Sequence, residues 1–437
     1  MTRDIDVIIV GAGFAGLIAA RELSSRGIEV LVVEGRDRLG GRTWVDDRLG
    51  TRLEMGGTWV HWLSPHVWSE ITRYGASIVE TGTGIAREMT WLVDGEPRSA
   101  PAEEAAPLLD EAMNRLWGES RTYFPYPYAD PATYEVPEAV DARSIGDVID
   151  EMHLDEDAYA LAEGMMSAMF NAPIHSVGVT QGLRWTAAAG HDWATMFEVS
   201  SLYKLVDGTR GLVDAIAADV RGDIRLNVPV AAVERNGQGF AVETRSGERL
   251  TARSVILTVP RNAVSAIDIR PALDPGKRQL LDEGCAALGT KVWMKVRGDH
   301  TGWSAYADGS LGLSWCGYYG PADGDSMLVG FGPSTELLDV TDLEQVRAVM
   351  ARWRPELEIL ECTGHDWVAD EFSRQTYLVQ RPGQHRGLRA LQRPEDGLFL
   401  VGSDYASGLG GYISGAIESA YENVPRVMRH LGAERTR

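Results

Sequence analysis

The stretch "DVIIVGAGFAG", residues 6–16, decides the fold class. Its first five residues form a short apolar run that is typical of a buried strand, and the glycines after it open a helical pattern over 17–27. A second apolar run, "IEVLVVE" at 28–34, predicts another buried strand that ends in an acid, Glu34. The order strand, glycine loop, helix, strand, acid predicts a Rossmann-type, dinucleotide-binding βαβ unit with the GxGxxG fingerprint.

The three glycines of the fingerprint have separate tasks. Gly11 permits the tight turn, Gly13 lets the backbone approach a pyrophosphate, and Gly16 lets the helix pack close to the strand. The first turn of the helix offers free N–H groups to the same anion. Glu34 follows eighteen residues after Gly16, where it can accept hydrogen bonds from ribose hydroxyls.

Two further glycine pairs distinguish this chain from a simple nicotinamide-binding protein. In "GRDRLGGRTW" at 35–44, Arg36 and Arg42 flank one pair, and backbone amides together with a guanidinium suit a pyrophosphate. "EMGGTWVHW" at 54–62 holds the other pair, followed by aromatic residues. A simple nicotinamide-binding fold has no need of these additions.

Composition and charge exclude several classes of function. The 437 residues are too many for one ordinary domain and suggest two. The net charge of −21 argues against nucleic acid and anionic lipid as partners, because both require a basic face. Two interpretations of this charge stay open: it concentrates a small cation such as an amine, or it serves only to keep the protein soluble.

The cysteines and the apolar segments bear on location. Cys285, Cys316 and Cys362 are far apart and lack metal-ligand spacing, so we expect reduced core thiols, a reducing compartment and no metal site. The apolar run at 5–20 is broken by glycines, so it is not a signal peptide. No stretch reaches the roughly 20 apolar residues needed to span a membrane. We expect a cytoplasmic protein with no membrane partner, and a homodimer stays open.

Local patterns predict further elements along the chain. Helical periodicity dominates the first half, and strand patterns separated by turns follow a third helix. The expected helices lie within 101–116, 144–170 and 208–220, and the expected strands within 224–235, 239–247, 254–260 and 398–406.

The segment 6–62 resembles the opening of the flavin-dependent amine oxidases, the family of monoamine and polyamine oxidases and bacterial hydroxynicotine oxidases. The resemblance is also strong over 288–296 and 365–420, and weaker over 78–207, where substrate choice is usually made. It implies an α/β fold in which a Rossmann-type FAD-binding domain is interleaved with an α+β substrate-binding domain. The expected FAD-binding parts are 1–77, 208–262 and 394–437, and the expected substrate-binding parts are 78–207 and 263–393.

The resemblance also implies which residues hold FAD. Those matched to the glycine loop, the acid and the "LGGR" segment would bind the adenosine and pyrophosphate, while later ones would lie near the adenine or the flavin ring. The implied FAD-binding residues are Gly11, Gly13, Gly16, Glu34, Arg36, Gly41, Arg42, Thr43, Gly57, Thr58, Trp59, Val230, Pro260, Trp367, Ser403, Asp404, Tyr412 and Ile413.

One lysine is a catalytic candidate. "LGTKVWMKVRG" at 288–298 alternates like a strand and places Lys291, Trp293 and Lys295 on one face. The family carries a lysine that holds a water next to flavin N5, and the resemblance matches Lys291 to it. A solvent-facing strand lysine is the alternative, and Lys295 is the competing candidate if the register differs by one pleat.

Two tyrosines match the aromatic cage of the family. Tyr377 follows Thr376 at the first cage position, and Tyr412 matches the second. Vertebrate monoamine oxidases have a cysteine immediately before the first cage tyrosine, and that cysteine carries the flavin. Threonine cannot form this thioether, so we expect non-covalent FAD.

The stretch "GLGGYISGAIESA" at 408–420 is expected to complete the cofactor site. Its adjacent glycines turn the chain, and a helix begins near Ile413 with its amino terminus toward the flavin's pyrimidine edge. The helix dipole would stabilise negative charge there by about 0.3–2 kcal/mol. The small residues before this turn, up to Ser403, allow close approach to the cofactor, and Asp404 can accept from it.

The chemistry that the resemblance implies is oxidation of a small primary or secondary amine to an imine. A hydride equivalent passes to flavin N5, O2 reoxidises FAD to give H2O2, and the imine hydrolyses. The implied catalytic residues are Lys291, Tyr377 and Tyr412, and both tyrosines would also bind the substrate. His61 either contacts a second polar group of the substrate or is satisfied by backbone.

Other functions were weighed against this hypothesis. His61 and the acidic charge favour a polyamine oxidase as the main alternative. No arginine accompanies Trp59, Val60 and His61 to hold a carboxylate, which disfavours an L-amino-acid oxidase. The cage and Lys291 argue against a flavin desaturase and against a non-catalytic flavin-binding module.

Overall fold

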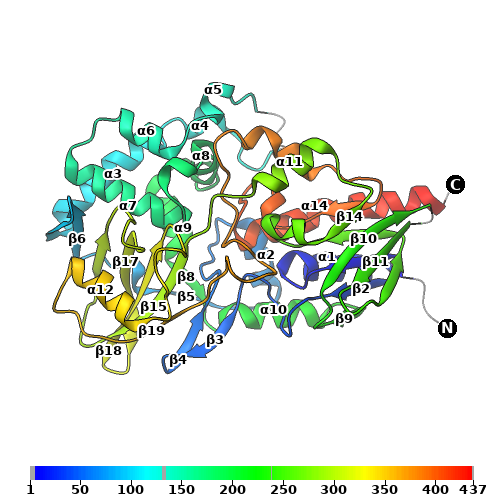
Figure 1. Cartoon of the computed structure of the whole chain (residues 1–437), viewed down its shortest axis with the longest axis horizontal. Helices are drawn as coiled ribbons and strands as arrows, with labels where there is room; N and C mark the ends of the chain where they lie inside the picture. The colour runs from blue at the N-terminus through cyan, green and yellow to red at the C-terminus, as the bar shows by residue number, and fades with distance from the viewer. Residues whose placement is uncertain (1–4, 130–133, 238, 436–437) are drawn as a thin grey trace.

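A parallel five-stranded sheet lies in the lobe that holds both ends of the described chain (Figure 1). The computed structural model describes residues 5–129, 134–237 and 239–435. The sheet draws its strands from the beginning, middle and end of the sequence, and every neighbouring pair is parallel. In sheet order the strands are β20 (Leu398–Leu400), β13 (Ser254–Leu257), β1 (Val7–Val10), β2 (Val30–Val33) and β9 (Asp223–Arg225).

Both faces of this sheet are covered, which explains why its strands are apolar throughout. In β1, Val7 and Ile9 pack against the helices on one face, whereas Ile8 and Val10 pack against a second sheet. The helices are α1 (Phe14–Ser24), α2 (Pro65–Arg73), α10 (Gly208–Ala218) and α14 (Ile413–Arg435). The second sheet has the order β12 (Arg249–Ala252), β11 (Gly239–Thr244), β10 (Val230–Asn236), β14 (Asp268–Arg270). Short helices α11 (Pro275–Glu283) and α13 (Leu388–Gln392) complete this lobe.

A mostly antiparallel seven-stranded sheet forms the other lobe (Figure 1). Its one parallel pair among the described strands joins β16 to β6. In sheet order the strands are β19 (Ile359–Gly364), β15 (Thr290–Val296), β18 (Asp325–Gly332), β17 (Trp315–Ala322), β16 (Trp303–Tyr306), β6 (Glu88–Val93) and β7 (Glu96–Pro101).

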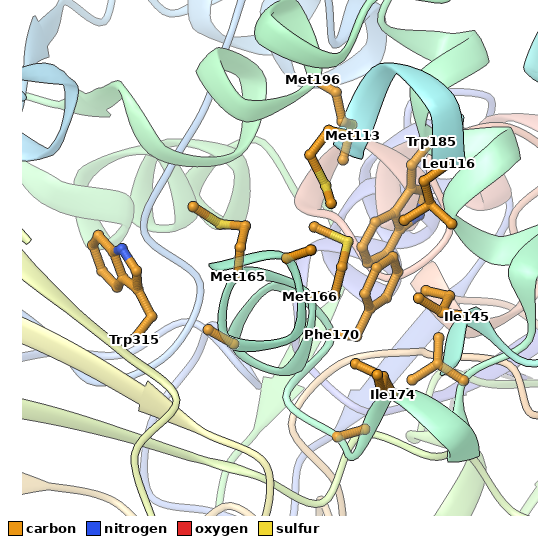
Figure 2. Close-up of a cluster of buried hydrophobic side chains, with 14 of the residues drawn as sticks. Met113, Leu116, Ile145, Met165, Met166, Phe170, Ile174, Trp185, Met196 and Trp315 are labelled. Atoms are coloured by element: carbon orange, nitrogen blue, oxygen red, sulfur yellow. The ribbon is translucent and has the colours of Figure 1, made fainter. Parts of the chain in front are cut away.

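Helices cover both faces of the seven-stranded sheet. Helix α12 (Leu343–Trp353) packs on one face through Val346 and Met350. The opposite face carries a helical cluster whose core is rich in methionine and aromatic side chains, including Met165, Phe170 and Trp185 (Figure 2). The helices of this cluster are α3 (Ala102–Leu116), α4 (Ser120–Tyr123), α5 (Glu138–Asp141), α6 (Ile145–Glu151), α7 (Glu156–Phe170), α8 (Val179–Ala188) and α9 (Trp193–Ser201).

Two small ribbons and several single turns connect these layers. The ribbons pair β3 (Val45–Arg48) with β4 (Thr51–Glu54) and β5 (Ile78–Glu80) with β8 (Tyr203–Leu205). The 3₁₀ turns are η1 (Gly82–Gly84), η3 (Ile174–Ser176), η4 (Arg261–Ala266), η5 (His385–Gly387) and η6 (Ser403–Tyr405). Among the described residues, no helix combines the length and apolar character that crossing a membrane requires.

Two segments differ from the sequence expectation. The stretch 224–235 is not one strand, because β9 and β10 belong to different sheets. Asn227 between them has a φ of 58°, and Pro229 has no N–H to donate to a ladder. The strand expected within 398–406 ends at Leu400, and residues 403–405 form a 3₁₀ turn. The helical pattern within 144–170 is confirmed and consists of α6 and α7, which are separated where His153 has a φ of 48° and Asp155 caps α7. The domain limits stay a prediction. One observation bears on the limit at 262: the chain beyond it still contributes β14 to the four-stranded sheet.

Candidate functional site

One long cavity runs from the carboxyl ends of β1 and β2 to two tyrosines beside the helical cluster. Most residues predicted to form the site line it, and three do not: Gly16, Asp404 and His61. The predicted residues that line the cavity are Gly11, Gly13, Glu34, Arg36, Gly41, Arg42, Thr43, Gly57, Thr58, Trp59, Val230, Pro260, Lys291, Trp367, Tyr377, Ser403, Tyr412 and Ile413.

The turn between β1 and α1 needs its glycines for space as well as for backbone conformation. Gly11 has a φ of 109°, and a Cβ there would lie 2.4 Å from Thr258 Oγ1. A Cβ on Gly16 would lie 2.0 Å from the Gly11 oxygen, so this residue supports the turn from behind. Helix α1 has Gly13 as its N-cap and no side-chain cap. Its first-turn N–H groups are therefore available to an anion in the cavity.

Glu34 closes this end of the cavity at the end of β2. Its Oε2 accepts a hydrogen bond from Ala12 N at 2.8 Å, and its Oε1 accepts one from Arg36 N at 2.9 Å. Each carboxylate oxygen keeps a second lone pair. The buried acid is thus fixed in place and can still accept from a ligand.

Arg36 is oriented by Asp370, a residue that was not predicted from the sequence. Its guanidinium donates to Asp370 Oδ1 at 2.5 Å and to Ser373 Oγ at 2.8 Å, and it lies 5.2 Å from the Phe372 ring centre. Burial alone would raise the pKa of Asp370, but a hydrogen bond with His365 and the charge of Arg36 lower this pKa to about 2. The aspartate therefore holds Arg36 as an ion pair.

Arg42, in the glycine-containing segment 35–44, connects this segment to Ser403 and Asp404. It donates to Asp404 Oδ1 at 2.5 Å and to Ser403 Oγ at 2.9 Å. Asp404 is buried behind the wall, where its Oδ2 also accepts from Arg261 N and from Gln375 Nε2. Burial opposes ionisation of Asp404, yet Arg42 and these hydrogen bonds hold its pKa below the usual range. Asp404 thus orients Arg42 instead of lining the cavity.

A glycine turn brings Tyr412 and the start of α14 to the cavity wall. Gly411 has a φ of 90°, and a Cβ there would lie 2.8 Å from the Leu378 oxygen. Its N–H donates to the Ser403 oxygen at 3.0 Å. Helix α14 begins at Ile413, which lines the cavity, so its first-turn N–H groups also lie there.

Lys291 is the strand lysine that reaches the cavity. It is buried, and its Nζ lies 2.9 Å from the main-chain carbonyl oxygen of Glu54, 3.0 Å from that of Gly56 and 2.6 Å from Thr58 Oγ1. Lys295 does not line the cavity, and its Nζ lies 3.9 Å from the exposed carboxylate of Asp323. Burial lowers the pKa of Lys291, and the Glu54 carboxylate raises it in part.

The two tyrosines present rings, not acids, to the cavity. Tyr377 donates its hydroxyl hydrogen to the Met169 oxygen at 2.6 Å, and the Tyr412 hydroxyl bonds Ser200 Oγ at 2.8 Å. Burial raises both pKa values well above the usual one for a phenol. Both rings are therefore neutral and tethered by their hydroxyls to the helical cluster.

Trp185 is a third aromatic wall, which the sequence did not reveal. Its ring meets Tyr412 edge-on at 4.9 Å between centres and lies 6.3 Å from Tyr377. It also stacks on Phe170 (Figure 2) and donates to the Gly410 oxygen at 2.9 Å. In the sequence, Trp185 is a single tryptophan in the segment that forms α8, and such a residue is equally typical of a buried core.

The compartment beside the tyrosines is apolar and carries no carboxylate among its described lining residues. Its further lining side chains include Met165, Met169, Phe197, Trp315 and Phe331. The acids that line the described cavity are Glu34 and Glu371, and both lie at the Arg36 end.

His61 lies behind this wall with both ring nitrogens occupied. Its Nδ1 accepts from Leu63 N at 3.0 Å, so its Nε2 carries the hydrogen and donates to Glu198 Oε1 at 3.0 Å. The ring is 1% exposed and also packs on Trp62. Of the two arrangements expected for His61, the structure has the one satisfied within the protein.

The geometry fits a flavin dinucleotide. The amino terminus of α1 and two arginines suit the pyrophosphate, and Glu34 suits a ribose. The amino terminus of α14 suits the negative charge of a reduced flavin ring. At the other end, the Trp59 indole N–H is buried without an acceptor among the described residues, as expected of a donor that a bound group satisfies. Trp367 lines the same region and donates to the Met55 oxygen at 3.0 Å.

Comparison with known proteins decides the family. Residues 14–428 match the family model of the flavin containing amine oxidoreductases. The chain belongs to this family. This amine oxidoreductase is 31% identical over 435 residues to pseudooxynicotine dehydrogenase of Pseudomonas sp, covering 98% of this chain and 87% of the relative. It is 29% identical over 430 residues to (S)-6-hydroxynicotine oxidase of Paenarthrobacter nicotinovorans, covering 95% and 97%.

A solved structure agrees with the fold of this amine oxidoreductase. Putrescine oxidase bound to putrescine superposes with a TM-score of 0.83 at 23% identity, covering 98% of this chain and 99% of the other. The predictions of the family, the α/β fold, the enzyme class and FAD as cofactor are confirmed. The roles of individual site residues stay predictions.

Proposed function

We propose that this FAD-dependent amine oxidoreductase oxidises a small, largely apolar amine with one basic nitrogen, primary or secondary, to an imine. The observation that carries the proposal is the uncharged compartment between Lys291 and the two tyrosines. Methionine and aromatic side chains there suit an aromatic or cyclic body. Bound FAD supplies the electron sink for the hydride equivalent that leaves the carbon beside nitrogen.

The protein's part in this reaction is binding and orientation. The proposed FAD-binding residues are those named by sequence, with Gly16 and Asp404 acting from behind the wall. Tyr377 and Tyr412 would hold the amine nitrogen between their faces and direct its neighbouring carbon toward the flavin. Because both phenols stay neutral, neither serves as a base, and the substrate must give up its own ammonium proton before oxidation.

The polyamine alternative receives less support from the site. Putrescine and longer polyamines carry a second ammonium, which needs a carboxylate or a polar partner when it is buried. The acids lining the described cavity lie at its far end, and His61 is occupied by Glu198. The named substrates of the two relatives, pseudooxynicotine and 6-hydroxynicotine, support a compact substrate with an aromatic ring.

The electron acceptor is a separate part of the proposal. We propose O2 as acceptor, with H2O2 as product. One relative is named an oxidase and the other a dehydrogenase, so family membership does not decide between O2 and another oxidant. Mixing the reduced enzyme with O2 tests this directly: reoxidation within seconds supports the oxidase, and a flavin that stays reduced for minutes contradicts it.

FAD is proposed to be bound without a covalent link. Thr376 lines the cavity where a cysteine would be needed, and its hydroxyl donates to the Ala287 oxygen at 3.2 Å. Acid precipitation should therefore release the flavin into the supernatant. Yellow colour that stays with the pellet after washing contradicts this.

A cytoplasmic location is also proposed. Cys285, Cys316 and Cys362 are all free thiols, which suits a reducing compartment. Fractionation of the producing cells checks this, and recovery of the enzyme outside the cytoplasm would refute it.

The amine specificity is tested by anaerobic stopped-flow mixing of the yellow holoenzyme with a panel of amines. Cyclic secondary amines and arylalkylamines should bleach the flavin, whereas putrescine, spermidine and α-amino acids should do so at least tenfold more slowly. Faster bleaching by spermidine than by every monoamine favours the polyamine alternative. Bound FAD that no amine reduces refutes the proposed function.

A further inference from the structure

Glu54, whose main-chain carbonyl oxygen accepts a hydrogen bond from Lys291, carries a buried carboxylate that has no role in the function proposed above. Glu54 ends β4 and is 5% exposed. Its Oε1 accepts from Thr209 N at 2.6 Å and its Oε2 accepts from Thr209 Oγ1 at 2.9 Å. Thr209 lies in the first turn of α10, where the helix dipole favours a negative charge. The fold therefore fixes this carboxylate in a low-dielectric region, where burial raises its pKa to about 6 although the hydrogen bonds from Thr209 and the charge of Lys291 lower it in part.

The amine of Lys291 has full hydrogen bonding in either charge state. As an ammonium it donates to the main-chain carbonyl oxygens of Glu54 and Gly56 and to Thr58 Oγ1. As a neutral amine it donates to the two carbonyls and accepts from the Thr58 hydroxyl, which can rotate. Hydrogen bonding alone does not select between the two states, so the surrounding charges must do so.

Glu54 is the carboxylate that acts on Lys291, and it is shared with a second lysine. Burial opposes the charge of Lys291, and Glu54 favours it. Lys204 in β8 is in the same situation: burial lowers its pKa and Glu54 raises it in part. The Lys204 Nζ lies 5.1 Å from the ring centre of Tyr319, whose pKa burial raises, so this phenol stays neutral.

We propose that Glu54 is a positioning residue that sets the protonation state of Lys291 and thereby the positive charge presented to the cofactor. This inference rests on the proposed function, because it takes Lys291 to lie beside bound FAD. A cation in the cavity wall raises the midpoint potential of a bound flavin, since reduction adds negative charge to it. Removing the counter-charge should let Lys291 lose its proton at lower pH.

The test is the midpoint potential of FAD in the holoenzyme, measured by dye equilibration from about pH 5 to 9, because burial lowers the pKa of Lys291 to about 7 and the Glu54→Gln variant should lower it further. Plotted against pH, the potential should show an inflection where Lys291 deprotonates. Glu54→Gln should move this inflection to lower pH by about one unit, which is a tenfold change in proton affinity. Lys291→Met should abolish it. Thr209→Val weakens the hold on the same carboxylate, should move the inflection less in the same direction, and replaces Glu54→Gln if that variant does not fold.

Two control variants separate this role from a general loss of packing. Lys204→Met should retain the inflection; if it abolishes the inflection, the titration belongs to Lys204 and the inference is overturned. Asp141→Asn removes a buried carboxylate outside the cavity that is also held by backbone N–H groups and a threonine hydroxyl, and it should leave the inflection in place. An inflection that moves equally in Asp141→Asn contradicts a specific role for Glu54.

Three further results would overturn the inference: no inflection in the unmodified enzyme, an inflection that Lys291→Met leaves intact, or one that neither Glu54→Gln nor Thr209→Val moves. The measurement needs bound FAD but no amine turnover. A holoenzyme that no amine reduces would therefore refute the proposed function without deciding whether Glu54 controls Lys291.

Discussion

At the scale of single residues, the hydroxyls of Tyr377 and Tyr412 fix the position of each side chain, whereas the rings carry the proposed function. Each hydroxyl is used in a hydrogen bond to the helical cluster, Tyr377 to Met169 and Tyr412 to Ser200. Ring position and ring polarity can therefore be separated by mutation. The same holds for Trp185, whose indole N–H donates to the Gly410 carbonyl, while its ring meets Tyr412 edge-on and lies tilted at 6.3 Å from Tyr377.

Tyr412→Phe should lower the rate of anaerobic flavin reduction by less than about fivefold, because it removes a hydrogen bond worth roughly 1 kcal/mol and keeps the ring. Tyr412→Ala should lower this rate by on the order of a hundredfold, because the amine loses its orienting face. Stopped-flow absorbance measures both rates. Equal losses in the two variants would show that the hydroxyl, not the ring, is required.

At the scale of elements, a buried ion pair fastens the helices that carry both anion-binding termini. Arg21 in α1 donates to Glu70 Oε2 in α2 at 2.5 Å and to the Tyr421 hydroxyl in α14 at 2.8 Å. Tyr421 in turn donates to Glu70. Because Arg21 and Glu70 are almost fully buried, neither charge can be satisfied by water if its partner is lost.

Glu70→Gln should therefore destabilise the protein by about 1–3 kcal/mol, because the buried Arg21 loses one of its two carboxylate partners and keeps only Glu22. Urea unfolding followed by tryptophan fluorescence measures the change. Asp214→Asn is the control, because it removes the partner of Arg210 from an exposed i,i+4 pair on α10 and should leave the unfolding midpoint unchanged. A Glu70→Gln midpoint within error of the unmodified protein would refute the clamp.

The turn before α14 makes a second prediction at this scale. Gly411→Ala should slow flavin reduction by roughly tenfold or more, since the new Cβ must push Leu378 and Tyr412 apart and displace the proposed cage. Gly75→Ala is a matched control: its φ of 62° carries the same kind of strain, but a Cβ there meets nothing within 4 Å. Flavin reduction in Gly75→Ala should be unchanged, and equal slowing in both variants would contradict a role for the turn.

Elements that depend on neighbouring residues in the chain could be predicted from the sequence, whereas contacts between distant residues could not. The unit of β1, α1 and β2 follows from apolar periodicity and three glycines within 6–34, and it was predicted correctly. Asp370, Trp185 and Glu54 were missed because their partners lie far away in the chain, and only the folded chain brings them together. The split between β9 and β10 was missed because the apolar pattern continues across Asn227.

At the scale of the whole molecule, the net charge of −21 creates a field that a cationic amine would feel before it binds. If this field assists capture, the second-order rate of flavin reduction by a protonated amine should fall several-fold between about 0.02 and 0.5 M salt, because the Debye length shortens. An amine that is uncharged at the assay pH is the control and should show no fall. Identical salt dependence for both amines would indicate that the net charge of the protein serves only its solubility.

The order of strands in the parallel sheet has a consequence for how the protein is made in the cell. Strand β1 is synthesised about 240 residues before its neighbour β13, and β13 then waits for β20. At roughly 5–20 residues per second, the nascent chain holds an apolar, half-paired sheet for on the order of 20–80 s. Arg42 meets Asp404 only at the end of that interval. The proposed cofactor site is therefore complete only after Asp404 has been synthesised, and the growing chain should depend on chaperones that shield open strand edges until β20 arrives.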